Sequence, residues 1–156
     1  MKALTNLSYV FLFIPVLVIE LFIGIFTEFS DLEVLPFLIL LIYISINKFS
    51  NAYIFAFFFS GIYYDLFYTS NYFGSTSAKF LSIAVIINFI NNKLNDNFLN
   101  EFLLFLIAVS IYKFEFIIYS FSFTQLTIIF LISAINYFLF KLINITLKSD
   151  VFKKSI

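Results

Sequence analysis

Long apolar runs constrain the fold of this chain more than any other feature of its sequence. Stretches of roughly 17 to 25 mostly apolar residues follow one another, which is about the length that a helix needs to cross the hydrocarbon core of a bilayer. Apolar and polar residues do not alternate, 63% of the residues are hydrophobic, and the mean hydropathy is +1.07. We therefore expect a membrane protein with the bilayer as its solvent.

The residue types that are missing exclude most kinds of enzyme site. The chain has no Cys and no His, so it has no disulfide, thiolate nucleophile, His general base or His/Cys metal site. No glycine-rich phosphate loop, Ser/His/Asp set or pair of catalytic carboxylates is present. The net charge of zero gives no basic footprint for nucleic acid. We expect a non-enzymatic protein without cofactor, metal or nucleic-acid partner.

The apolar runs predict an all-α, polytopic membrane protein with six transmembrane helices joined by short loops. No soluble domain or linker interrupts them, so residues 1–156 form one integral membrane domain. The expected helices cover residues 7–26, 34–47, 51–68, 74–90, 98–119 and 125–145, followed by a basic tail over 146–156.

The lysines predict the orientation of the six spans. Lys2, Lys48, Lys93 and the three lysines of the tail fall on one side, whereas the opposite connections hold acidic or neutral residues. Lys113 is the exception. By the positive-inside rule, both termini are cytoplasmic, and the protein is placed in a bacterial cytoplasmic membrane as a multi-pass protein.

The stretch from Gly61 to Gly74 places a carboxylate inside an apolar segment. Gly61, Tyr64 and Asp65 share one helix face at spacings of three and four residues, so they look toward the same neighbour. A short polar connection follows, and the next helix is expected to start near Gly74. Lys79 then lies at the same depth as Asp65 on the adjacent antiparallel helix. We predict an ion pair that holds the two helices in register, with an ion or substrate relay as the alternative.

Two further features concern helix contacts. Ala52, Ala56 and Ser60 form a stripe of small residues beside Gly61 that allows another helix to approach, either within the chain or from a partner. Glu20 lies deep in the first span. It is either a proton or substrate site or the acceptor of a hydrogen bond from a Tyr, Ser or Asn across the bundle.

The residues Gly61-x-x-x-Asp65, the short polar connection and Phe73-Gly74 resemble the rod shape-determining protein MreD family of the bacterial inner membrane. That family shows a Gly-x-x-x-Asp, a Gly/Ser-rich turn and a Leu-Gly pair. Leu35-Pro36, followed by an apolar run to Tyr43, resembles the Pro-led second span of the family. The resemblance covers residues 36–91, and the length and span number agree with it.

This resemblance implies a scaffold of the cell-elongation machinery that regulates cell shape and peptidoglycan synthesis. Its implied partners are the lipid bilayer, the bitopic protein MreC and, through MreC, the cytoskeletal protein MreB and the peptidoglycan synthases. The alternative is the substrate-binding membrane subunit of an energy-coupling-factor vitamin transporter, which also has about six short-looped helices. The Ala52/Ala56 pair resembles the docking stripe of that group, but it lies in the third helix instead of the first.

Overall fold

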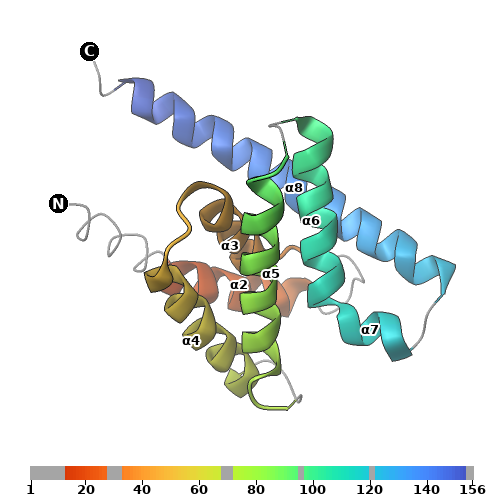
Figure 1. Cartoon of the computed structure of the whole chain (residues 1–156). Helices are drawn as coiled ribbons and strands as arrows, with labels where there is room; N and C mark the ends of the chain where they lie inside the picture. Colours follow the sequence, from red (N-terminus) through yellow and green to blue (C-terminus); the bar gives the residue numbers. More distant parts are fainter. Residues whose placement is uncertain (1–12, 28–32, 68–71, 95–96, 120–121, 154–156) are drawn as a thin grey trace.

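The computed structural model describes residues 13–27, 33–67, 72–94, 97–119 and 122–153, and all regular structure within these ranges is α-helical. The prediction of an all-α chain is therefore confirmed for these ranges. Figure 1 shows the helices in chain order: α2 (Phe13–Thr27), α3 (Pro36–Asn47), α4 (Asn51–Phe67), α5 (Ser75–Asn91), α6 (Phe98–Tyr112), α7 (Phe114–Tyr119) and α8 (Phe123–Lys153).

The helices α3, α4 and α5 begin and end close to the predicted residues. Pro36 occupies the first turn of α3, where its missing N–H costs no helical hydrogen bond. Gly74 precedes α5 with φ +92°, a left-handed conformation that glycine adopts without strain. The predicted start of the first helix at residue 7, and Lys2, lie outside the described residues.

The predicted single helix over 98–119 is too long, because the helix is interrupted at Lys113. Lys113 ends α6 with φ −91° and ψ 19°, and α7 starts at the next residue. Lys113 and Glu115 are two positions apart and would point to different sides of a continuous helix. They reach separate partners: Lys113 pairs with Glu33, and Glu115 pairs with Lys79. The break allows both ion pairs to form.

The predicted end of the last helix at residue 145, and the separate tail after it, are also corrected. Helix α8 continues to Lys153. The prediction placed the end where the apolar run stops, but no Gly or Pro lies between Gln125 and Lys153 to interrupt a helix. The end of an apolar run is thus not the end of the helix.

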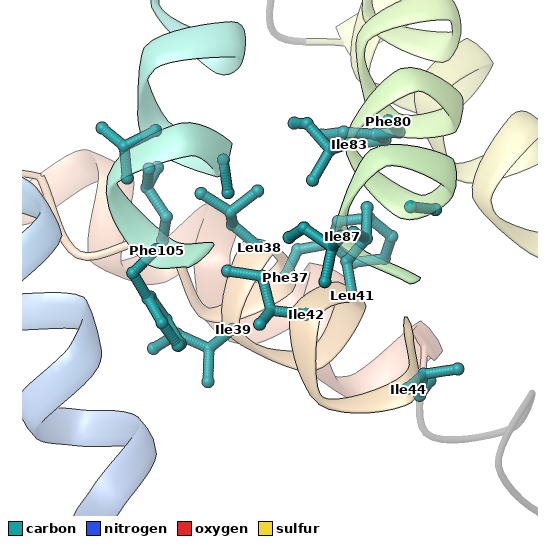
Figure 2. Packing of buried hydrophobic residues seen from close by; sticks show 14 of the residues in the cluster. Phe37, Leu38, Ile39, Leu41, Ile42, Ile44, Phe80, Ile83, Ile87 and Phe105 are labelled. Atoms are coloured by element: carbon teal, nitrogen blue, oxygen red, sulfur yellow. The ribbon is translucent and has the colours of Figure 1, made fainter. Parts of the chain in front are cut away.

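Helix α3 lies at the centre of the packing. It contacts α2, α5, α6 and α8, while α4 packs along α5, and α6 packs against α5, α7 and α8. Figure 2 shows side chains of α3 meeting those of α5 and α6. This core contains the fully buried Phe37, Leu41 and Ile42 of α3, Phe80, Ile83 and Ile87 of α5, and Phe105 of α6.

Helix lengths set a limit on the membrane prediction. Within the described ranges, one stretch of α8, Phe123–Ile145, is long and apolar enough to cross a membrane. Pro36–Asn47, Ser75–Asn91 and Phe98–Tyr112 are apolar but shorter. These lengths do not support six full-length spans.

Helices α4 and α5 lie very close together at Gly61. A Cβ atom built on Gly61 would lie 2.3 Å from the Cα and 2.5 Å from the backbone N of Ser77. The Ser77 hydroxyl donates a hydrogen bond of 3.0 Å to the carbonyl oxygen of Phe58. Glycine is therefore required at position 61 for the two backbones to meet at this distance.

We predict that Gly61→Ala lowers the free energy of unfolding by about 1 to 3 kcal/mol, because the added methyl group meets backbone atoms that cannot rotate away. Thermal unfolding of the purified protein in mild detergent measures the change. Ala52→Val, on the exposed side of the same helix, is the matched control and should be close to neutral. If Gly61→Ala is as stable as the unsubstituted chain, this result would contradict the close approach of the α4 and α5 backbones.

Candidate functional site

Asp65 accepts hydrogen bonds from the start of α5. Its Oδ2 lies 2.7 Å from the backbone N of Gly74, and its Oδ1 lies 3.0 Å from the backbone N of Thr76. The first N–H groups of a helix have no partner within the helix, and its N-terminus carries a partial positive charge. The Asp65 carboxylate at the end of α4 accepts hydrogen bonds from these N–H groups and places a negative charge at the positive end of α5. Asp65 is buried, with 7% of its surface exposed. Asp65 is therefore a cap provided by a neighbouring helix.

The predicted ion pair between Asp65 and Lys79 is wrong, because Lys79 pairs with another carboxylate. The ammonium of Lys79 lies 2.8 Å from Oε1 of Glu115 on α7, and the Ser75 hydroxyl donates to the same oxygen at 3.1 Å. The prediction matched the depths of two charged residues on adjacent helices. It did not count the backbone N–H groups of α5, which lie nearer to the end of α4 than a side chain placed more than a turn into α5.

Glu20 plays the corresponding role at the start of α3. Its Oε2 accepts a hydrogen bond of 2.6 Å from the backbone N of Phe37, and the Tyr64 side chain also interacts with this carboxylate. Glu20 is buried with 8% exposed, and Phe37 is fully buried. Of the two predicted roles, the structure shows the hydrogen-bonded one, with a backbone amide as the donor at 2.6 Å.

Asn136 of α8 completes the start of α3, and the sequence analysis missed it. Its Oδ1 accepts from the backbone N of Leu35 at 2.8 Å, and its Nδ2 donates to the carbonyl oxygen of Glu33 at 3.1 Å. The Nδ2 atom also donates to the carbonyl oxygen of Ile132. Asn136 is fully buried. A single amide within an apolar run was the available signal, because an amide is both donor and acceptor.

Among the described residues, three ion pairs connect segments that are distant in sequence. Besides Lys79 with Glu115, the ammonium of Lys113 lies 2.6 Å from Oε2 of Glu33. Lys141 of α8 pairs with Glu101 in the first turn of α6, and Tyr137 donates to the same carboxylate at 3.1 Å. Each pair is partly exposed, so each connects helices at the edge of the bundle and not in its core.

The other predicted residues divide between the interior and the surface. Tyr64, Ser60 and Gly61 are buried, and the Tyr64 ring packs between Phe37 of α3 and Phe80 of α5. The shared inward face of Gly61, Tyr64 and Asp65 is confirmed. Ala56 is half-buried and Ala52 is exposed. The small-residue stripe therefore serves internal packing at its Gly61 end and is open at its Ala52 end.

These groups together position helices relative to one another. The five acidic side chains that the structure describes all accept from a backbone N–H or a lysine: Glu20, Glu33, Asp65, Glu101 and Glu115. Within the described ranges, no group of three or more metal-ligating residues comes together. The candidate site is thus the Gly61–Asp65–Gly74 corner of α4 and α5, with the Glu20–Asn136 cap on α3 beside it.

Comparisons with protein-family models, with curated proteins and with solved structures give no match to this chain.

We predict that Lys79 is energetically coupled to Glu115 and not to Asp65. In a double-mutant cycle, Lys79→Gln with Glu115→Gln should show a coupling energy of at least about 0.5 kcal/mol, since the two charges are in contact. Lys79→Gln with Asp65→Asn should be additive within about 0.5 kcal/mol. Unfolding in mild detergent measures both cycles. If the coupling energy of Lys79 with Asp65 were larger than that with Glu115, the Asp65–Lys79 pair would be the correct assignment.

We also predict that Glu20→Gln is tolerated and Glu20→Leu is not. The amide of Gln keeps an oxygen that can accept from the N–H of Phe37, whereas Leu leaves that buried N–H unpaired at a cost of about 1 to 3 kcal/mol. Thermal unfolding compares the two variants. If Gln is as costly as Leu, the negative charge itself is needed, as expected for a proton or substrate site.

Proposed function

We propose that this chain is a multi-pass scaffold of the bacterial cell-elongation machinery, of the MreD type, acting through contacts between membrane helices. The observation that carries the proposal is the joint role of Gly61, Asp65 and Gly74. These residues also carry the sequence resemblance. Gly61 permits the close approach of α4 and α5, Asp65 caps α5, and Gly74 turns the chain into α5.

The surface of the bundle supports a membrane environment. Large apolar side chains are exposed on several helices, including Phe55 and Phe59 on α4 and Phe89 on α5, at 65%, 64% and 59%. Helix α8 adds Phe130 and Phe138 at 51% and 63%. Water-soluble monomers rarely expose contiguous apolar area on this scale, whereas lipid tails accept it without cost. We infer a polytopic arrangement with both termini cytoplasmic.

The use of the polar groups supports a scaffold over a transporter. A vitamin-binding subunit needs polar side chains that face a ligand. In this chain the buried Glu20, Asp65 and Asn136 bind backbone groups at helix starts. We therefore propose the scaffold alone, with helix faces such as the open end of the small-residue stripe available to a partner helix.

Affinity purification from mildly solubilised membranes tests the proposal. The tagged chain, expressed with the MreC and MreB proteins of the same source, should recover MreC, and MreB through it. A tagged, unrelated multi-pass protein at the same level is the control and should recover neither. Recovery of a radiolabelled vitamin without MreC would overturn the proposed function in favour of transport.

A further inference from the structure

Two layers of charged residues bound the apolar part of the bundle. The outer layer, as defined here, contains the pairs Lys79–Glu115 and Lys113–Glu33. The inner layer contains the pair Lys141–Glu101, and Lys93 lies on the same side in the turn after α5. Helix α6 carries a member of each layer, Glu101 in its first turn and Lys113 at its end.

The charged groups mark where hydrocarbon must end. All six side chains of the three pairs are partly exposed. A partly exposed charge is costly against lipid tails and stable among headgroups and water. Lysine can extend its ammonium over several ångströms, but Glu has a shorter side chain and holds its charge near its own backbone. Glu101 therefore marks the depth of the inner layer, and Lys113, which contacts Glu33, marks the outer one.

The distance between the two layers is short. Glu101 and Lys113 are twelve residues apart on the same helix, which at 1.5 Å per residue is about 18 Å. A typical hydrocarbon core is about 30 Å thick, so the two layers are closer together than the two faces of such a core.

Helix α3 fits the same short distance. Helix α3 has only 12 residues, and both of its ends are described. The apolar stretch of α8 has 23 residues, but α8 runs obliquely to α5 and α6 in Figure 1, so its length does not require a thick bilayer. Helix α7 turns away from α6 directly after Lys113, at the outer layer (Figure 1).

We propose that the lipid partner of this protein is a locally thinned bilayer, whose hydrocarbon meets the bundle only between the two charged layers. The inference rests on the proposed membrane function and deepens it by naming the kind of lipid environment. Lipids next to the bundle shorten or tilt their acyl chains to match it, because exposing charged pairs to hydrocarbon costs more than compressing the lipid. The bundle therefore favours short acyl chains around itself.

Reconstitution of the full chain in phosphatidylcholine vesicles of increasing acyl length tests the proposal. The lipids carry fourteen-, eighteen- or twenty-two-carbon monounsaturated chains, and circular dichroism follows thermal unfolding. We expect the unfolding temperature to be highest in the fourteen-carbon lipid and lower by about 5 to 10 °C in the twenty-two-carbon lipid. If the unfolding temperature is highest in the eighteen- or twenty-two-carbon lipid, or does not depend on acyl length, the bilayer is not thinned around the protein.

A paired substitution sharpens this measurement. Glu101→Leu together with Lys141→Leu replaces the inner ion pair by apolar side chains and lengthens the apolar surface. The lipid that gives the highest unfolding temperature should then shift to a longer acyl chain. An unchanged optimum would show that the inner pair does not set the thickness.

Single tryptophans measure depth without this double substitution. The chain has no native Trp, so Leu99→Trp near the inner layer and Phe114→Trp near the outer layer each give one signal. Depth-dependent quenching by spin-labelled eighteen-carbon lipids should place both at the headgroups, and Phe59→Trp in the middle of α4 near the bilayer centre. If Leu99→Trp or Phe114→Trp lies in the hydrocarbon, the bilayer is not thinned. If Phe59→Trp is unquenched and alkaline extraction releases the protein, the membrane function itself is wrong.

Discussion

The starts of α3 and α5 depend on acceptors from other helices. The first N–H groups of α3 and α5 have no partner within their own helix, and in apolar surroundings each unpaired group would cost several kcal/mol. Asp65 supplies the acceptor for α5, and Glu20 and Asn136 supply those for α3. Each acceptor comes from a different helix than the one it caps. Helix formation and the packing of helices against one another are therefore coupled in this chain.

The need of every polar group for a partner also explains where the remaining charged side chains lie. A charge that is not used as a cap must meet an opposite charge or a polar boundary, since neither hydrocarbon nor the core solvates it. Glu115 and Glu33 meet Lys79 and Lys113 at one end of the bundle, and Glu101 meets Lys141 at the other. The ion pairs thus connect segments that are distant in sequence, and in our proposal they also limit the apolar surface that meets lipid.

The sequence predicted helix positions well where local signals mark the ends. Pro36 and Gly74 fix the starts of α3 and α5, because a missing N–H and a left-handed φ are local properties. The break at Lys113 was not predictable from local pattern, since it depends on partners 80 positions away in one pair and on Lys79 in the other. Asp65 was correctly predicted to be buried. Its partner was predicted wrongly, because only the depths of charged side chains were compared and the backbone N–H groups of α5 were left out. Asn136 was missed because one amide in an apolar run has no periodic partner.

Gly61 and Asp65 are best understood as one device and not as two residues of a motif. The carboxylate of Asp65 is short, and it reaches the N–H groups of Gly74 and Thr76 at 2.7 and 3.0 Å only if α4 and α5 lie close together. Gly61, one helical turn earlier, allows that approach because its missing Cβ leaves room for the Ser77 backbone. A larger residue at position 61 would move the carboxylate away from α5 and leave its helix start unpaired. The four-residue spacing of the glycine and the acid follows from this geometry, since it places both on the face that meets α5.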